Sequence, residues 1–218
     1  MDPSLTGFGW CIHNSVAEGL ARIVKRGVLK SDAKTIFVQR YMDFRSHVAA
    51  LLTENPEIEV VGIESPVYGE QWSSGAYALF VYITEMVYTH KKDVVFFDPG
   101  TVKMLAKIDH EQRKGQMFKV DMVNAAKADT GVKGKFNHNE ADAYHVARFT
   151  ARFFSLLKGD LSEKDLSPAE KQAFINEHTF KRGPRKGLTE RNGALYKEGS
   201  RFFCFSRMAQ LCPIPPVT

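Results

Sequence analysis

The stretch that most constrains the fold runs from Ile58 to Pro66, after a helical pattern, and ends in an acid. Its apolar residues are almost continuous, which is typical of a central strand buried on both faces of an α/β sheet. Pro66 ends the ladder because it has no N–H to donate. Glu64 therefore lies at the carboxyl end of a buried strand, where open α/β sheets bind their ligands.

Hydrophobic periodicity predicts strands and helices on both sides of this strand. The expected strands are 8–13, 20–29 and 93–97, and the first two form a hairpin. The expected helices are 31–55 capped by Ser31-Asp32, 76–90, 102–106 capped by Asp98, 117–128, 137–157 and an exposed one within 160–173 with a capping box at Ser167. A second, shorter hairpin is expected from 194–196 and 201–205. This order of elements indicates an α/β fold.

Two further acids occupy positions that packing does not explain. Asp2 precedes a turn of Pro, Ser, Thr and Gly that runs into the first strand. Asp142 lies between two alanines on the helix face expected to pack against the sheet, where a carboxylate is costly without a cation or donor. Asn139 and His138 precede it by three and four residues and share its face, whereas Glu140 points elsewhere in a regular helix.

Charge is concentrated near the carboxyl end of the chain. The protein has 218 residues and a net charge of +5, and residues 178–207 hold eight Lys or Arg against two Glu. The rest of the chain is almost neutral. Basic residues interleaved with Gly, Pro and aromatics favour contact with a nucleic-acid backbone. Four basic residues of this segment are the expected DNA contacts: Lys181, Arg182, Arg185 and Lys186.

Two aromatics follow the buried strand in a loop rich in Gly and Ser. Tyr68 and Trp72 either stack on the bases of an opened or branched nucleic acid, or cover the edge of the sheet. The three cysteines, Cys11, Cys204 and Cys212, share no close spacing and suit a reducing compartment. No apolar run approaches the roughly 20 residues of a membrane helix, so we expect an intracellular protein with no membrane partner.

Carboxylates from separate elements converge only where a cation offsets their repulsion. Hard oxygen ligands suit Mg²⁺ or Mn²⁺. Two such ions can activate a water and stabilise the leaving oxygen of a phosphodiester.

Three motifs, in this order, resemble those of the RuvC-type Holliday junction resolvases of the RNase H-like fold, especially the bacteriophage members. They are Asp2-Pro3-Ser4-Leu5-Thr6-Gly7-Phe8-Gly9-Trp10, Ile63-Glu64-Ser65-Pro66 and Asn139-Glu140-Ala141-Asp142-Ala143. The resemblance implies a mixed β-sheet flanked by helices over residues 1–157, followed by a small basic extension over residues 158–218.

The resemblance also implies roles for particular residues. Asp2, Glu64 and Asp142 match three of the family's four metal-binding acids, and the fourth position falls on Asn139, with His138 or Glu140 as alternatives. Lys119 is similar to the family's basic residue near the scissile phosphate, and Tyr68 to its junction-wedging aromatic. The family has a whole strand before its first acid, whereas only Met1 precedes Asp2 here. We interpret this as a truncated start, and without that strand Asp2 is expected to be poorly held.

The leading hypothesis is a Mg²⁺- or Mn²⁺-dependent endodeoxyribonuclease that cleaves branched DNA such as four-way junctions during recombination or repair. We expect a homodimer, because two symmetric nicks need two sites, and a cytoplasmic location, in the host cytoplasm if the protein is viral. Two alternatives stay open: a junction-binding protein without activity, and an actin-like ATPase or sugar kinase.

Overall fold

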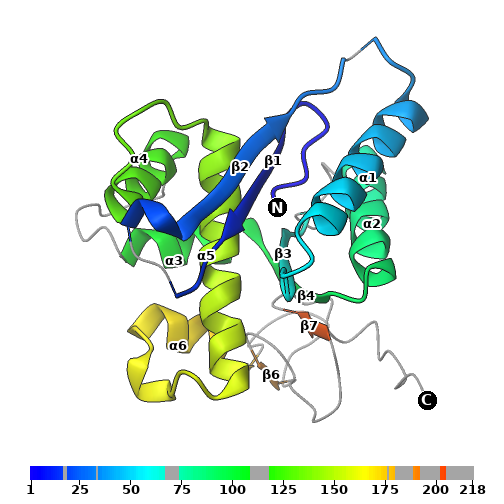
Figure 1. The fold of residues 1–218 in the computed structure, drawn as a ribbon. Helices are drawn as coiled ribbons and strands as arrows, with labels where there is room; N and C mark the ends of the chain where they lie inside the picture. Colours follow the sequence, from blue (N-terminus) through cyan, green and yellow to red (C-terminus); the bar gives the residue numbers. More distant parts are fainter. Residues whose placement is uncertain are drawn as a thin grey trace.

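The computed structural model describes residues 1–16, 19–32, 34–66, 74–108, 118–175, 177–179, 189–191 and 202–204. The elements, in chain order, are β1 (Phe8–His13), η1 (Gly19–Arg22), β2 (Ile23–Leu29), α1 (Phe37–Glu54), β3 (Val60–Glu64), α2 (Ser74–Thr89), β4 (Asp93–Phe97), α3 (Pro99–Ile108), α4 (Lys119–Thr130), α5 (His138–Lys158), η2 (Glu163–Asp165), α6 (Pro168–Phe174), β5 (Glu177–Thr179), β6 (Thr189–Arg191) and β7 (Phe202–Cys204). Figure 1 shows their arrangement.

The first two residues join two sheets. β1 and β2 form the predicted antiparallel hairpin, and β3, β4 and β7 form a parallel sheet. Asp2 exchanges two backbone hydrogen bonds with Gly9 of β1, at 2.9 and 3.1 Å. On the other side, the Met1 amino group donates to the Gly62 carbonyl at 2.7 Å, and the Glu64 N–H donates to the Met1 carbonyl at 3.0 Å. Met1 and Asp2 thus occupy the centre of one mixed sheet, between the hairpin and β3 (Figure 1).

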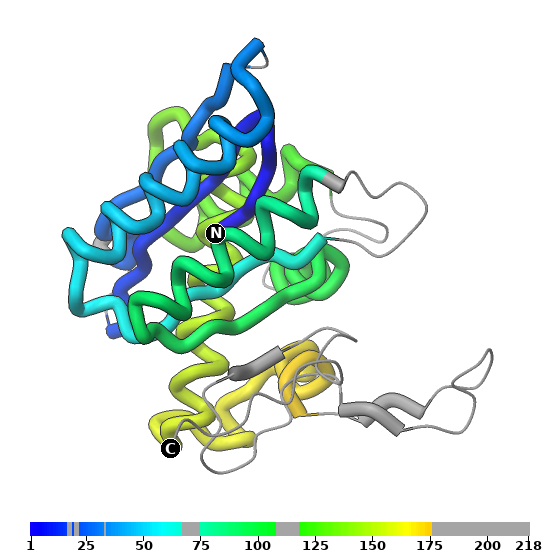
Figure 2. The backbone as a smooth tube through the Cα atoms, turned by 90° about the vertical axis from the view of Figure 1, so that its right-hand side faces the viewer, coloured from blue at the N-terminus to red at the C-terminus, as the bar shows by residue number. Residues whose placement is uncertain are grey.

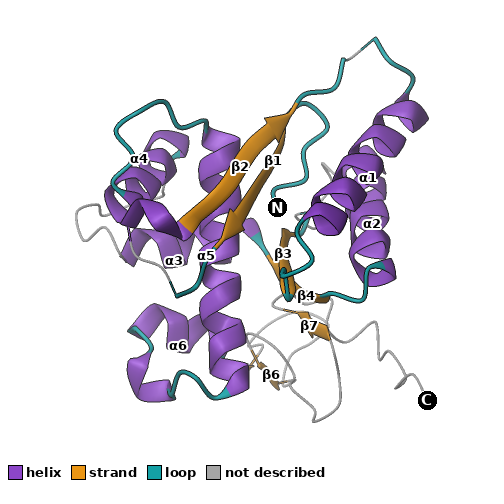
Figure 3. Cartoon of the chain, in the orientation of Figure 1, coloured by secondary structure: helices purple, strands orange, loops and turns teal. Residues whose placement is uncertain are grey.

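Helices cover both faces of this sheet. α1 and α2 pack on one face, and α5 lies on the other with α3 and α4 beyond it (Figures 2 and 3). The alternation of strand side chains separates the two cores. Val94 of β4 belongs to the core under α1 and α2, together with Ile63 of β3, whereas Val95 belongs to the core with Phe149 of α5. This architecture is the predicted α/β class.

Helix α5 runs unusually close to the sheet because two glycines leave room for it. A Cβ atom on Gly62 of β3 would lie 1.9 Å from Thr150 Oγ1, and one on Gly9 of β1 would lie 2.1 Å from the Asn139 carbonyl oxygen. Ala141 and Ala143 of α5 are fully buried, as the small residues of the sequence predicted. The close approach brings the first turn of α5 to Asp2 and β1.

The predicted start of the first helix is wrong. α1 begins at Phe37, and its N-cap residue Ile36 makes no side-chain cap hydrogen bond. The Asp32 carboxylate instead accepts from the Lys34 N–H at 2.9 Å, and Ser31 Oγ donates to the Leu5 carbonyl at 2.6 Å. The Ser31 hydroxyl therefore bonds to a residue distant in sequence and does not cap the helix, and sequence spacing does not reveal this partner.

Other predicted boundaries are largely confirmed, with local differences. The expected strand 20–29 divides, because Gly19–Arg22 form the 3-10 helix η1 and β2 begins at Ile23. Asp98 caps α3 as predicted, accepting from the N–H groups of Gly100 and Thr101 at 2.9 and 3.1 Å. The Ser167 capping box is present, although the expected helix is only α6, preceded by η2.

The segments after α5 lie against the same core. Leu166, which precedes α6, and Phe174, its last residue, are buried with Phe153 of α5, and the Phe153 and Phe174 ring centroids are 5.3 Å apart. β7 pairs in parallel with β4, while residues 194–196, the other half of the expected hairpin, lie outside the described residues. The domain boundary between residues 157 and 158 stays a prediction. None of the described helices is long and apolar enough to cross a bilayer.

Candidate active site

Three acids from separate parts of the chain meet at one end of the central sheet. Asp2 lies in the central position, Glu64 is the last residue of β3, and Asp142 lies in the second turn of α5. The backbone holds the first two together, because the Glu64 N–H donates to the carbonyl of Met1, the residue before Asp2. Asp2 is therefore held by its own bonds to Gly9 and by the bonds of Met1 to β3, contrary to the expectation that it would be poorly held.

Burial raises the pKa values of all three carboxyl groups, and repulsion by neighbouring acids adds to the rise at Asp2 and Glu64. Burial, followed by the charge of Asp142, raises the pKa of Asp2 to about 7. The pKa of Glu64 is raised well above its usual value by burial and then by the charges of Asp2 and Asp142. Burial raises the pKa of Asp142 to about 6. Such shifts mark groups that lack enough positive charge nearby to stabilise their ionised forms.

Two lysines border these acids. Lys119 is the first residue of α4, and its charge lowers the pKa values of Asp2 and Asp142. Lys103 on α3 lowers those of Glu64 and Asp142. The sequence comparison indicated Lys119 but missed Lys103. The signal for Lys103 is its place in the helix that directly follows β4, the strand paired with β3.

The carboxylates suit a divalent cation in donor type and in charge. They are hard oxygen donors, and their raised pKa values show that a positive charge among them would be favourable. Within the described part of the chain, however, no three or more His, Cys, Asp or Glu side chains are gathered tightly enough to form a metal site as they stand. The acids are therefore near enough to repel one another without forming a closed ligand shell.

The residues around the predicted fourth ligand have distinct environments. The Asn139 side-chain N–H donates to the Gly7 carbonyl at 2.7 Å. Glu140 accepts from the Asn137 N–H at 2.9 Å in the capping box of α5, and its carboxylate lies 4.0 Å from Arg26. Burial, followed by the charge of Lys119, lowers the pKa of His138. Glu140 is thus engaged at the helix cap, Asn139 is bonded to the turn after Asp2, and His138 lies within the electrostatic reach of Lys119.

The remaining predicted site residues are the expected DNA contacts. The aromatics Tyr68 and Trp72 lie outside the described residues, as do the basic residues Lys181, Arg182, Arg185 and Lys186. Their roles in DNA binding stay predictions.

Two comparisons with solved structures identify the fold. A Thermus thermophilus RuvC structure in complex with a Holliday junction substrate matches with a TM-score of 0.57 and 16% identity, over 72% of this chain and 92% of that one. A second Thermus thermophilus RuvC structure matches with a TM-score of 0.53 and 18% identity, over 72% and 93%. No protein-family model and no curated protein matches the sequence. The chain therefore has the RNase H-like fold of the RuvC-type resolvases.

Proposed function

We propose that this protein is a metal-dependent endonuclease that hydrolyses phosphodiester bonds in branched DNA such as four-way junctions. The observation that carries the proposal is the meeting of Asp2, Glu64 and Asp142 at one end of the central sheet, where all three pKa values are raised by burial and those of Asp2 and Glu64 also by neighbouring acids. Buried like charges of this kind cost stability, so a fold keeps them for a cation or a substrate. The RuvC fold match and the basic carboxyl-terminal segment support the choice of branched DNA.

The residues divide the work of hydrolysis between them. Asp2, Glu64 and Asp142 would hold Mg²⁺ or Mn²⁺, two ions in all, with the Asn139 amide oxygen as a weaker fourth ligand. The bound ions supply activation of a water and stabilisation of the leaving oxygen. Lys103 and Lys119 act electrostatically on the acids and, on this proposal, would bind the non-bridging oxygens of the scissile phosphate.

The remaining contacts are assigned from their chemistry. Tyr68 and Trp72 would stack on unpaired bases at the branch point, and the basic residues 181–186 would hold the backbone. On this proposal residues 1–157 form the nuclease domain and residues 158–218 a DNA-binding extension. The protein acts in the cytoplasm, that of the host if it is viral, where its DNA substrate lies.

A four-way junction with one labelled strand tests the proposal. In Mg²⁺ we expect nicks near the branch point and little cleavage of a linear duplex of the same sequence. Asp142→Asn should reduce the rate on the order of 10²–10³-fold. Equal cleavage of junction and duplex, or an Asp142→Asn variant as active as the wild type, would refute the proposal. Tight junction binding with no cleavage in Mg²⁺ or Mn²⁺ would favour a non-catalytic junction-binding protein, which the absence of a closed ligand cluster among the described residues makes the second candidate.

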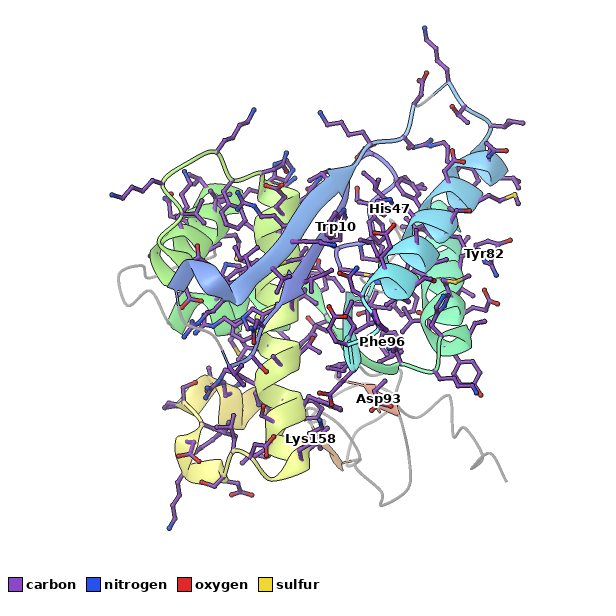
Figure 4. All side chains as sticks on the ribbon, in the orientation of Figure 1. Trp10, His47, Tyr82, Asp93, Phe96 and Lys158 are labelled. Carbon is purple, nitrogen blue, oxygen red and sulfur yellow. The ribbon has the colours of Figure 1, made fainter. Side chains whose placement is uncertain are left out.

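A homodimer is part of the proposal, because two strands of a junction are cut symmetrically. The outer faces of α1 and α2 carry a set of exposed apolar side chains, and Tyr82 points outward from α2 in Figure 4. This α1–α2 face consists of Phe37, Val38, Met42, Tyr77, Val81, Tyr82 and Tyr88. Arg45 and Glu85, 3.4 Å apart, add one charge of each sign to it. A face with both charges can pair with its own copy about a two-fold axis.

Sedimentation measurements test the dimer. Val81→Arg on the α1–α2 face should shift the protein toward the monomer, because it places a positive charge in the apolar contact. Val24→Arg is the matched control, since Val24 is about equally exposed but lies on β2. Dimers of unchanged stability in Val81→Arg would exclude this face as the interface.

A further inference from the structure

We infer that Asn139 is a positioning residue that clamps the turn after Asp2 and so fixes Asp2 relative to Asp142. The inference rests on the proposed function for its catalytic meaning, since it assigns a role within the same site. It does not rest on Asn139 binding a cation.

The clamp consists of two contacts between the first turn of α5 and the segment that follows Asp2. The Asn139 side-chain N–H donates to the Gly7 carbonyl at 2.7 Å. Two residues further on, Gly9 lies against the Asn139 backbone, where a Cβ atom would be 2.1 Å from the Asn139 carbonyl oxygen. Gly9 is also the residue that exchanges two backbone hydrogen bonds with Asp2. Asn139 therefore contacts the segment that holds Asp2 at both Gly7 and Gly9.

The start of α5 keeps Asn139 in register with Asp142. The Asn137 side-chain oxygen accepts from the Asn139 N–H at 2.9 Å, and Glu140 accepts from the Asn137 N–H at 2.9 Å. This capping box fixes where the helix begins. Asn139 and Asp142 are three residues apart and so lie on the same face of the helix. The distance between the clamped turn and the Asp142 carboxylate is then set by less than one turn of rigid helix.

The clamp requires an amide rather than a carboxylate. Gly7 offers a carbonyl oxygen, which accepts hydrogen bonds only, and the amide NH₂ is the donor that meets it. An ionised aspartate at position 139 has no donor and would set two oxygens against each other. It would also add a fourth negative charge to Asp2, Glu64 and Asp142, whose pKa values are already raised. With its N–H committed to Gly7, Asn139 has only its amide oxygen to offer a cation.

This predicts an unexpected result for Asn139→Asp, which places a fourth acid at the position that the resemblance assigns to the fourth metal ligand. If Asn139 served only as a weak ligand, the aspartate would bind the cation better. If Asn139 is a clamp, the aspartate should instead bind the cation less well. We expect Asn139→Asp to lower the melting temperature without metal by about 3–8 °C and to reduce the rise in melting temperature on adding Mn²⁺.

Hydrogen exchange supplies a readout that a general loss of stability would not give. In Asn139→Asp, the amides of Asp2 and Gly9 should exchange at least tenfold faster, while those of Val94 and Val95 in β4 keep their protection. Asn139→Ala, which removes the donor without adding charge, should show the same local acceleration with a smaller loss of stability. Asn137→Asp is the matched control, because its side chain only accepts, as a carboxylate also does; it should leave both amides unchanged.

The outcomes separate this inference from the proposed function. Faster exchange confined to the Asp2 and Gly9 amides supports the clamp even if no DNA is cleaved, because the measurement uses the protein alone. Unchanged exchange at both amides in Asn139→Asp and Asn139→Ala overturns it, and so does a larger Mn²⁺-induced rise in melting temperature in Asn139→Asp. Either result would count against the clamp alone and would not affect the proposed cleavage of junctions.

Discussion

Helix α5 contributes to two clusters of charged residues that differ in how the negative charge of their acids is balanced. At its first turns, Asp142 joins Asp2 and Glu64, and all three pKa values are raised. Farther along, Tyr144 and Arg148 reach Asp129 of α4. Burial would raise the pKa of Asp129, but the hydrogen bond from Tyr144 and the charges of Arg148 and Arg22 outweigh it and lower that pKa. These two groups are called here the site acids and the Asp129 cluster (Arg22, Asp129, Tyr144 and Arg148).

The Asp129 cluster shows how this fold balances a partly buried acid when nothing further is required of it. Arg22 lies 2.7 Å from one carboxylate oxygen, and Arg148 lies 3.3 Å from the other, which also accepts from the Tyr144 hydroxyl. Among the described residues, Lys103, Lys119 and the Met1 amino group lower the pKa values of the site acids but do not restore them to normal. The contrast indicates that the Asp129 cluster stabilises the fold, whereas the site acids reduce stability and, on the proposed function, are kept for a cation.

The largest effect on stability is expected at the Asp129 cluster. Asp129→Asn leaves Arg22 and Arg148 without their shared carboxylate and should lower the free energy of unfolding by about 3 kcal/mol, toward the low end for buried pairs because solvent reaches the cluster. Urea unfolding measures the loss. Asp43→Asn, at an exposed acid on α1, is the control and should change it by less than about 0.5 kcal/mol. Equal losses in the two variants would remove the distinction between the clusters.

The second effect is the response to a divalent cation. At a Mn²⁺ concentration about 100 times the dissociation constant, binding should stabilise the wild type by about 2.7 kcal/mol, and the melting temperature should rise. Asp129→Asn should keep this rise, because Asp129 and its partners Arg22, Tyr144 and Arg148 are not part of the site. Asp142→Asn should lose most of it. A full Mn²⁺ response in Asp142→Asn would show that the cation binds elsewhere.

The smallest effect is the pH dependence of stability without metal. The pKa of Asp142 is about 6 in the folded protein and 3.8 in its usual state, so its stabilising contribution is complete below about pH 4 and is lost as the pH rises through 6. Asp142→Asn removes this loss, and the variant should gain about 1–2 kcal/mol relative to the wild type between pH 4 and pH 7. Asp129 has a lowered pKa, so its contribution is present above pH 3.8 and is lost in acid. Thermal unfolding at several pH values measures the stability of each variant relative to the wild type. This difference should rise with pH for Asp142→Asn and fall with pH for Asp129→Asn.

Regular elements and the three acids that come together could be predicted from the sequence because each has a local cause. The apolar run before Glu64 predicts a buried strand, and the residues around Asp142 predict an amphipathic helix with an acid on its packed face. The central position of Met1 and Asp2 could not be predicted. It depends on backbone hydrogen bonds to Gly62 and Glu64, about 60 residues away, which leave no periodic pattern at the start of the chain.

Which charged residues balance one another could not be predicted from the sequence either. Arg22 and Asp129 are 107 positions apart and form a pair only after η1 folds against α4. Lys103 looks like any lysine of an amphipathic helix until β4 and β3 pair and bring α3 to the site. Asn139 appeared as a departure from an expected acid, because its partner, the Gly7 carbonyl, is a backbone group that carries no sequence signal. Residue types predicted the chemistry, but long-range contacts decide which charges are balanced.

The most direct test is to measure four-way-junction cleavage by Asp142→Asn and Asp129→Asn side by side, at a temperature where both variants are folded. The account predicts that Asp142→Asn is at least as stable as the wild type yet cleaves on the order of 10²–10³-fold more slowly, and that Asp129→Asn is less stable yet cleaves at close to the wild-type rate. Cleavage by Asp142→Asn at the wild-type rate, or loss of cleavage in folded Asp129→Asn alone, would contradict it.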